Sequence, residues 1–415
     1  MKKKVLIIGN SSKEYAFAKK MSETCEVYVA SGNDGIKEFA SCVDIRETSA
    51  QELLEFAMEN CIDLTIPVSV GALNTDIVNL FSKNNLQIFA PNKEAAKIIF
   101  DKAYAKKIMY KLHIPTPKFG IFEKQAMAND YLKNINTPFV IKTNSPSSAV
   151  ILTSVKASKP ILDSIFAEKY NKIIIEDYIY GSPFAFYAIT DGYKALPIGS
   201  SILYKHSLEG EGGQLTSGMG SCSPNYKISF ENEAFIMNNI IYPVLDYLER
   251  GGNPYAGIIS VNGILSESGE IQITGFGSFM QNSDCAGILE LINTDIYNLL
   301  ESCVIGSFSD EVDYIELKDI YTTSVVINCR NLNNTENIIT GLDELDDNTI
   351  VSFSNNVTKN KYLEYEAKYG DIAVLTTIGR TASSSTDKVY NELKYIQFSG
   401  KKYRNDIGNS VPACI

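Results

Sequence analysis

The chain has few histidines and no paired cysteines, the residues on which histidine-based catalysis and zinc binding depend. It contains two histidines, His113 and His206, and eight cysteines that stand singly, with no C-x-x-C pair. A Cys/His cluster at metal-ligand spacing is missing, so a zinc site is not expected and the thiols are predicted to be free and buried. With so little imidazole, neither a Ser-His-Asp nor a Cys-His catalytic arrangement is expected.

Long hydrophobic runs and an excess of positive charge are missing too. No apolar stretch reaches the roughly 18 residues of a membrane-spanning helix, and Met1-Lys2-Lys3-Lys4 leads into a strand pattern rather than a signal sequence. The 38 basic residues are outnumbered by 49 acidic ones, giving a net charge of -11. Neither nucleic acid nor an anionic membrane suits such a chain, because phosphate binding depends on Lys and Arg. We expect a cytoplasmic protein that acts on small molecules.

What is present is the composition of a globular protein of two to three domains, with 45% hydrophobic and 21% charged residues. Over the first ninety residues, predicted strands at 5–9, 27–30, 64–68 and 87–90 alternate with predicted helices at 50–60 and 75–83. This alternation predicts a doubly wound parallel sheet, in which ligands bind at the carboxyl ends of the strands.

The rest of the chain is predicted to mix helices and strands without an internal repeat. We expect one long helix over 93–112, ended by the breaker Ile114-Pro115-Thr116-Pro117, and a strand-rich section over 139–189. A polar, glycine-rich loop over 205–223 is followed by a helix over 231–249, a strand pair over 253–286 and a helix over 293–304. The last section, 321–415, is predicted to be mostly strands, with one helix near 383–393.

Many segments, in order along nearly the whole chain, resemble the glycinamide ribonucleotide synthetase (phosphoribosylamine-glycine ligase) family of the ATP-grasp superfamily. They include the segments 5–9, 31–33, 91–96, 101–106, 114–116, 140–142, 175–178, 216–220, 252–257 and 403–408. The resemblance implies an α/β fold with an N-terminal doubly wound parallel sheet, central ATP-grasp lobes and a C-terminal mostly-β domain. The implied domains are an N-terminal preATP-grasp (Rossmann-like) domain at 1–101, an ATP-grasp domain at 102–320 with a small lobe at about 114–190, and a C-terminal domain at 321–415.

The resemblance also implies a reaction in which ATP phosphorylates a carboxylate, glycine in the family, and an amine, phosphoribosylamine in the family, attacks the acyl phosphate. ATP and magnesium are the implied cofactors. Lys102 and Lys142 match lysines that reach the ATP phosphates, while Glu176 and Tyr178 stand where the family contacts adenine. The implied acceptor-binding residues are Lys205, Glu209, Glu211, Thr216, Gly218 and Gly220. No catalytic group is assigned.

At several positions the chain departs from the family pattern. The metal-binding glutamate and asparagine align with Gly275 and Gly277, and a neighbouring arginine aligns with Phe279. Because magnesium needs oxygen ligands, no metal ligand is assigned. Pro183 replaces a glutamate that binds the ribose, and the segment 143–150 has no glycine where the family has a glycine-rich phosphate loop. The candidate replacement metal ligands are Asn282, Asp284, Glu209 and Glu211.

Alternative functions therefore stay open at this point. The chain is either a divergent ATP-grasp ligase, for the purine reaction or for another carboxylate and amine, or a non-catalytic relative that binds a metabolite or a partner protein. A carrier role without ATP is a third alternative. A monomer or a homodimer is expected, with a protein partner as a further possibility. A nucleotide cleft filled by Phe279 or Pro183 would exclude the ligase.

Overall fold

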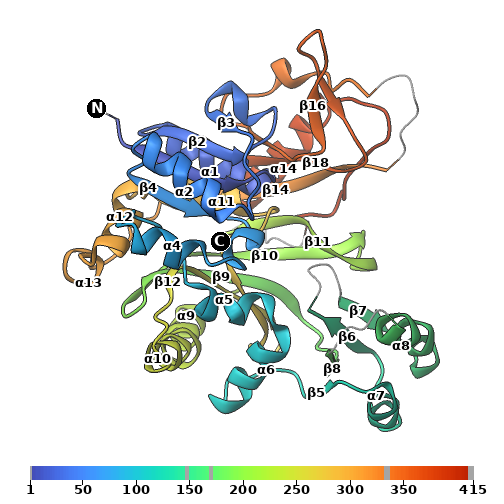
Figure 1. Cartoon of the computed structure of the whole chain (residues 1–415). Helices are drawn as coiled ribbons and strands as arrows, with labels where there is room; N and C mark the ends of the chain where they lie inside the picture. The colour runs from blue at the N-terminus through green and yellow to red at the C-terminus, as the bar shows by residue number, and fades with distance from the viewer. Residues whose placement is uncertain (1, 145–148, 168–171, 331–336, 410–415) are drawn as a thin grey trace.

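The protein begins with a parallel sheet covered by helices on both faces (Figure 1). This computed structural model describes residues 2–144, 149–167, 172–330 and 337–409. The sheet has the order β3-β2-β1-β4. Its strands are β1 (Lys4–Gly9), β2 (Glu26–Ser31), β3 (Ser41–Val43) and β4 (Leu64–Pro67), and its helices are α1 (Ser12–Ser22), α2 (Ala50–Glu59), α3 (Val70–Leu73) and α4 (Ile77–Lys83).

The continuous apolar run of β1 explains why this sheet is buried on both sides. Val5 and Ile7 pack in one core cluster with Phe17 of α1, whereas Leu6 and Ile8 pack in another with Leu53 of α2. The predicted doubly wound parallel sheet is therefore confirmed. The segment 87–90 contributes only an isolated bridge, between Thr65 and Ile88.

The helix predicted over 93–112 is two helices, α5 (Lys93–Phe100) and α6 (Lys102–Lys111), so the prediction of one long helix is wrong. Asp101 between them has extended backbone angles, and its carboxylate accepts the Tyr104 N–H at 3.0 Å. An aspartate in this role is an N-cap, which begins a new helix at the next residue. As a result, Lys102 lies in the first turn of α6.

A small lobe follows, with its own antiparallel sheet in the order β5-β8-β6-β7. The strands are β5 (Phe119–Phe122), β6 (Phe139–Thr143), β7 (Ala149–Leu152) and β8 (Ile173–Asp177), with helices α7 (Gln125–Leu132) and α8 (Ser158–Ala167) on one face. Ile173 and Ile175 of β8 pack against these helices. Because side chains alternate along a strand, Ile174 and Glu176 point to the opposite face.

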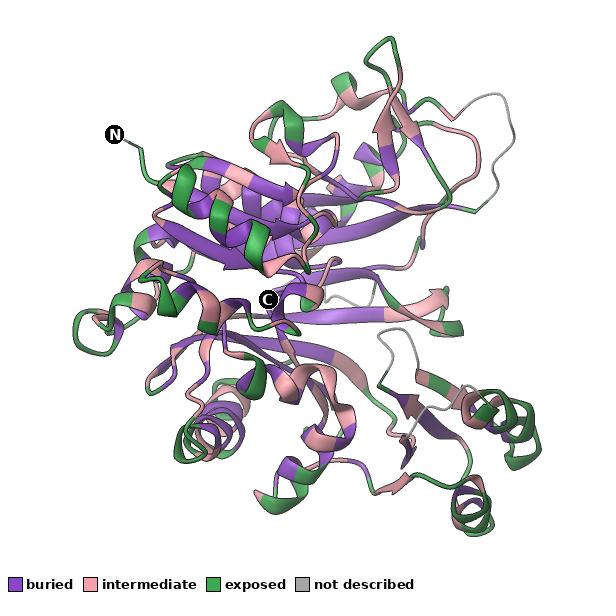
Figure 2. Ribbon diagram, in the orientation of Figure 1, coloured by how far each residue is buried: buried purple, intermediate pink, exposed green. Residues whose placement is uncertain are grey.

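The largest element is a nine-stranded sheet in the order β13-β12-β9-β10-β11-β14-β18-β15, with β19 paired to β14. Its strands are β9 (Ser182–Asp191), β10 (Ala195–Leu208), β11 (Gly212–Ser223), β12 (Ala256–Leu265), β13 (Ile271–Ser278), β14 (Tyr321–Cys329), β15 (Ile350–Phe353), β18 (Gly370–Gly379) and β19 (Lys401–Lys402). Figure 2 shows that most of these strands are buried along much of their length.

The loop predicted over 205–223 is in fact the hairpin β10–β11, so that prediction is wrong. Glycine suggested a loop, but here it allows a close approach of backbones within the sheet. A Cβ on Gly220 would lie 2.6 Å from the Ser324 carbonyl oxygen of β14.

The remaining helices cover the large sheet and the C-terminal strands. They are α9 (Phe230–Ile236), the π-helical turn η3 (Met237–Ile241), α10 (Tyr242–Arg250), α11 (Cys285–Leu291), α12 (Ile296–Ile305), α13 (Phe308–Glu311) and α14 (Ala382–Glu392); short 3-10 turns are η1 (Ile36–Glu38), η2 (Val155–Ala157) and η4 (Leu342–Glu344), and β16 (Val357–Lys359) pairs with β17 (Tyr365–Ala367). None of the helices in the described ranges is long and apolar enough to cross a membrane. The seven described cysteines are free thiols; five are buried, Cys42 is half-buried and Cys61 is exposed.

Candidate functional site

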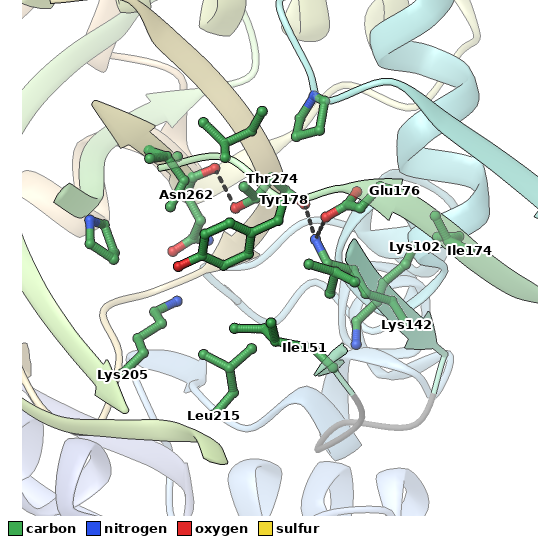
Figure 3. A pocket seen from close by; sticks show the side chains of 18 of the residues that line it. Lys102, Lys142, Ile151, Ile174, Glu176, Tyr178, Lys205, Leu215, Asn262 and Thr274 are labelled. Carbon is green, nitrogen blue, oxygen red and sulfur yellow. Dashed lines mark hydrogen bonds and ion pairs between the residues drawn. The ribbon is translucent and has the colours of Figure 1, made fainter. Parts of the chain in front are cut away.

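A cavity of about 730 Å³ lies where the small lobe faces the large sheet (Figure 3). Its walls come from β6, β7 and β8 of the small lobe, from α5 and α6, and from β10 to β13. Seven of the ten site residues predicted from the sequence line it: Lys102, Lys142, Glu176, Tyr178, Lys205, Glu211 and Thr216. Residues separated by more than a hundred positions in sequence thus line one cavity.

Glu176 is the buried carboxylate at one end of the cavity. Its side chain is 2% exposed and forms ion pairs with Lys106, at 2.8 Å, and with Lys142. Burial alone would raise the pKa of Glu176, but the charges of Lys142 and Lys106 hold it below its ordinary value. One carboxylate is therefore shared by two ammonium groups.

Lys106 extends this network to the large sheet. Its ammonium group also donates to the Thr116 hydroxyl at 2.6 Å, which in turn donates to the Ile273 carbonyl oxygen at 2.7 Å. Lys106 is not among the site residues predicted from the sequence. Its position in the sequence could have indicated this role. Lys106 lies four residues after Lys102 in a segment that matches the family, and residues at this spacing share a helix face.

Lys142 crosses the cavity from β6 of the small lobe to β13 of the large sheet. In addition to its ion pair with Glu176, its ammonium group donates to the Thr274 carbonyl oxygen at 3.3 Å (Figure 3). Lys102, in the first turn of α6, faces the same space. Burial, with a further contribution from the positive charge of Lys142, lowers the pKa of Lys102 to about 8.

Lys205 projects into the cavity from β10, on the side opposite the small lobe (Figure 3). Its ammonium group makes no hydrogen bond or ion pair with another residue in the described ranges, although the charge of Asp284 acts on it. Burial lowers the pKa of Lys205 to about 8, and the charges of Lys142 and Lys102 add to the effect. Thr216 donates a hydrogen bond to the Lys205 carbonyl oxygen at 2.9 Å, which fixes the backbone at this position.

The two predicted acidic residues of the hairpin are bound by the C-terminal segment. Arg404, whose side chain is 2% exposed, donates to Glu211 at 2.8 Å, to Asp406 at 2.7 Å and to the His206 carbonyl oxygen at 3.0 Å. Asn405 donates to Glu209 at 2.8 Å. Glu211 reaches the rim of the cavity, whereas Glu209 does not line it. Both carboxylates therefore hold the tip of β10–β11 against residues 404–406.

Gly218 and Gly220 are buried in β11 and do not line the cavity. Gly218 has φ +137°, and a Cβ there would lie 2.7 Å from the Ser283 hydroxyl oxygen. Glycine is needed at this position because other residues rarely adopt that backbone angle and would not fit. In this structure the two glycines make close packing possible, and the acceptor-binding role predicted for them stays a prediction.

Magnesium does not fit the side chains around Gly275 and Gly277. Neither glycine offers an oxygen beyond its carbonyl, and in the described part of the chain no three His, Cys, Asp or Glu residues gather as a metal site. Each candidate replacement is engaged elsewhere. Asn282 accepts from the Ser11 hydroxyl at 2.8 Å and the buried Asp284 accepts from the Tyr187 hydroxyl at 2.6 Å, while Glu209 and Glu211 are held as described above.

Phe279 and Pro183 leave the cavity open. Phe279 is 2% exposed and packs edge-to-face on Phe17 at 5.5 Å and on Phe89 at 6.3 Å, away from the cavity walls. Pro183 is part of the lining but does not fill the space. Neither residue fills the cavity in this structure. The predicted departure over 143–150 includes residues 145–148, which lie outside the described ranges.

Comparison with known proteins identifies the family. Residues 3–98 match the family model of the phosphoribosylglycinamide synthetase N domain, and residues 100–282 match that of its ATP-grasp (A) domain. A phosphoribosylamine-glycine ligase of Caldanaerobacter subterraneus subsp. tengcongensis is 28% identical over 416 residues, which cover 97% of this chain and 99% of the relative.

Solved structures show the same fold. The phosphoribosylamine-glycine ligase of Thermotoga maritima matches with a TM-score of 0.82 at 21% identity, covering 97% of this chain and all of that one. A biotin carboxylase domain of Hydrogenobacter thermophilus 2-oxoglutarate carboxylase, solved with MgADP, matches with a TM-score of 0.71 at 15% identity, covering 97% and 92%. From the matched domains and the shared fold, the chain belongs to the phosphoribosylglycinamide synthetase family of the ATP-grasp superfamily.

Proposed function

We propose that this protein is an ATP-dependent ligase that joins the carboxylate of glycine to the amine of phosphoribosylamine. The observation that carries the proposal is the convergence of Lys102, Lys142 and Lys205 on one cavity between two lobes (Figure 3). Family membership supports it, as do two matches of nearly the same length that are named for this activity, the relative from Caldanaerobacter and the solved structure from Thermotoga.

In the proposed reaction a carboxylate oxygen of glycine attacks the γ-phosphorus of ATP, and the bond to the leaving ADP breaks. The amine nitrogen then attacks the acyl phosphate carbon and the C–O bond to the phosphate breaks. Inorganic phosphate leaves with the proton that the nitrogen loses as the amide forms. Phosphoryl transfer depends mainly on positioning and on neutralising negative charge. Lys102 and Lys142 supply positive charge where the nucleotide phosphates would lie. Lys205, on the opposite wall, would face the acyl phosphate as it forms.

The cavity walls suit a nucleotide base and the exclusion of water. Ile98, Met109, Ile174 and Ile264 give the end near α5, α6 and β12 an apolar surface. Tyr178 and Tyr180 pack edge-to-face at its rim, with ring centroids 4.9 Å apart. Apolar walls with a few convergent polar groups are typical of ligand sites. The adenine role of Glu176 and Tyr178 is part of this proposal. Because the Glu176 carboxylate is bound by lysines, this role would use the backbone at the end of β8 and at Tyr178 just after it.

The test is a turnover assay with ATP, glycine and phosphoribosylamine, in which ADP is measured and the amide product is identified by mass. We expect ADP release only when both co-substrates are present, and loss of turnover in Lys205→Met. Lys107→Met is the matched control, because Lys107 is exposed on α6 beside the buried Lys106. Binding of ATP without turnover by any combination of substrates would contradict the proposal and favour the binding-only alternative.

A further inference from the structure

The cavity has a marked excess of positive charge on its walls. Among the described residues, four lysines line it, Lys102, Lys106, Lys142 and Lys205, and Glu176 is placed among them. Two other carboxylates belong to the lining, but Glu211 is paired with Arg404. Asp177 lies on the same face of β8 as Ile173 and Ile175, because side chains alternate along a strand. That face packs toward α7 and α8, away from the cavity. Glu176 is therefore the described lining carboxylate that faces these lysines, and positive charge exceeds negative charge on this part of the wall.

The wall where a divalent cation would need ligands is made of backbone. A Cβ on Gly275 would meet no atom within 4 Å, so this position opens directly into the cavity. The nearby side chain of Asn262 is engaged, since it donates to the Ser260 hydroxyl at 3.1 Å and accepts from Gln281 at 2.7 Å. Glu176 is held by two lysines. Among the residues that the structure describes, no carboxylate near Gly275 is free to coordinate a metal.

We propose that this cavity binds the phosphates of its nucleotide without a divalent cation, with the ammonium groups of Lys102, Lys142 and Lys205 supplying the neutralising charge. The inference rests on the proposed function, because it concerns the same nucleotide. The inference goes beyond the proposed function, because it predicts that nucleotide binding does not need magnesium.

Electrostatics favours a polyanion in this space. Like charges in an enclosed, partly desolvated cavity repel one another more strongly than in water. Burial together with this repulsion lowers the pKa values of Lys102 and Lys205 to about 8. An anion placed between them relieves the repulsion and gives Lys205 a hydrogen-bond partner. A metal ion at the same point would add positive charge beside these ammonium groups.

The test is calorimetric titration of the full chain with ATP at pH 7.5, once with excess EDTA and once with excess Mg²⁺. We expect the dissociation constant for ATP in EDTA to be no more than about twice that in Mg²⁺, because the lysines attract the metal-free nucleotide directly. Affinity at least tenfold weaker in EDTA would overturn the inference and leave the ligase proposal standing. No binding in either condition would overturn both.

Two variants test which residues are responsible. Lys205→Met should weaken ATP binding at least tenfold in EDTA, while the exposed control Lys107→Met should bind like the wild type; unchanged binding by Lys205→Met would overturn the inference.

Gly275→Glu should place a carboxylate in the open space beside the phosphates. We expect it to weaken binding in EDTA and to regain affinity with Mg²⁺. Failure to regain it would contradict the role given to Gly275. Thermal melting of each variant without ligand checks that it is folded.

Discussion

At the scale of single residues, the charge balance of the cavity depends on Glu176. It is the buried carboxylate between two lysines, and its position on the cavity face follows from the alternation of β8. A buried ion pair adds little net stability compared with an apolar replacement, but removing one partner leaves the others uncompensated. We therefore expect Glu176 to contribute to stability as well as to the position of Lys142.

Replacing Glu176 by glutamine keeps the shape of the side chain and removes its charge. We expect Glu176→Gln to lower the free energy of unfolding by about 3 kcal/mol, because Lys106 and Lys142 would then be buried without a counter-charge. Urea unfolding at pH 7.5, followed by circular dichroism, measures this change. Glu123→Gln is the control, since Glu123 is 67% exposed and lies 3.7 Å from Lys172, and should change stability by less than about 0.5 kcal/mol. A loss below about 1 kcal/mol for Glu176→Gln would contradict the prediction.

Sequence reasoning identified residues that lie in matching segments but not the contacts that they make. Lys102, Lys142 and Lys205 were predicted to share a site, and the structure places all three on one cavity. Glu211 was assigned to the acceptor, yet its ion pair is with Arg404, 193 positions away. Such long-range pairs depend on how strands associate, which spacing along the chain does not reveal.

At the scale of elements, the hairpin β10–β11 is the feature that the sequence described least well. Its glycines, serines and threonines are common in loops, so the local preference indicated a loop. The strands form because β11 pairs with β14, and because residues 404–406 bind the tip of the hairpin. Most other predicted elements are present near their predicted bounds, since their hydrophobic patterns match their own secondary structure.

Arg404 should therefore determine how rigid this hairpin is. We expect Arg404→Met to lower the free energy of unfolding by about 2–3 kcal/mol, because Asp406 and the His206 carbonyl oxygen would lose a buried, charged donor. Amide hydrogen exchange of residues 205–216 should accelerate more than that of β1, which the change does not touch.

The matched control is Arg380→Met, because Arg380 is exposed. Equal exchange rates in the hairpin of wild type and Arg404→Met would show that the arginine is not what holds it.

At the scale of the whole molecule, the large sheet runs across the domain boundary proposed at 321. Strand β14 pairs with β11, and one core cluster joins Ile202 and Cys222 to Val325, Leu375 and Val389. The small lobe is different, because among the described residues its sheet and its core cluster are made of residues of that lobe alone. The order of elements could be predicted from the sequence, but the pairing of strands a hundred residues apart could not. The boundaries at 101 and 321 remain proposals from the family resemblance.

This arrangement predicts that the C-terminal section is required for folding and the small lobe is not. We expect the fragment 1–320 to aggregate or to melt without a cooperative transition, because it would expose the β11 edge and the buried side chains of Ile202, Tyr204 and Cys222. In the control, a short glycine linker joins Lys118 to Glu176 in place of residues 119–175. It can close because the Asp177 N–H already lies 2.9 Å from the Lys118 carbonyl oxygen. This variant should stay soluble and unfold cooperatively in a calorimetric melt. A cooperative transition of 1–320 close to that of the full chain would instead make 321–415 an independent domain.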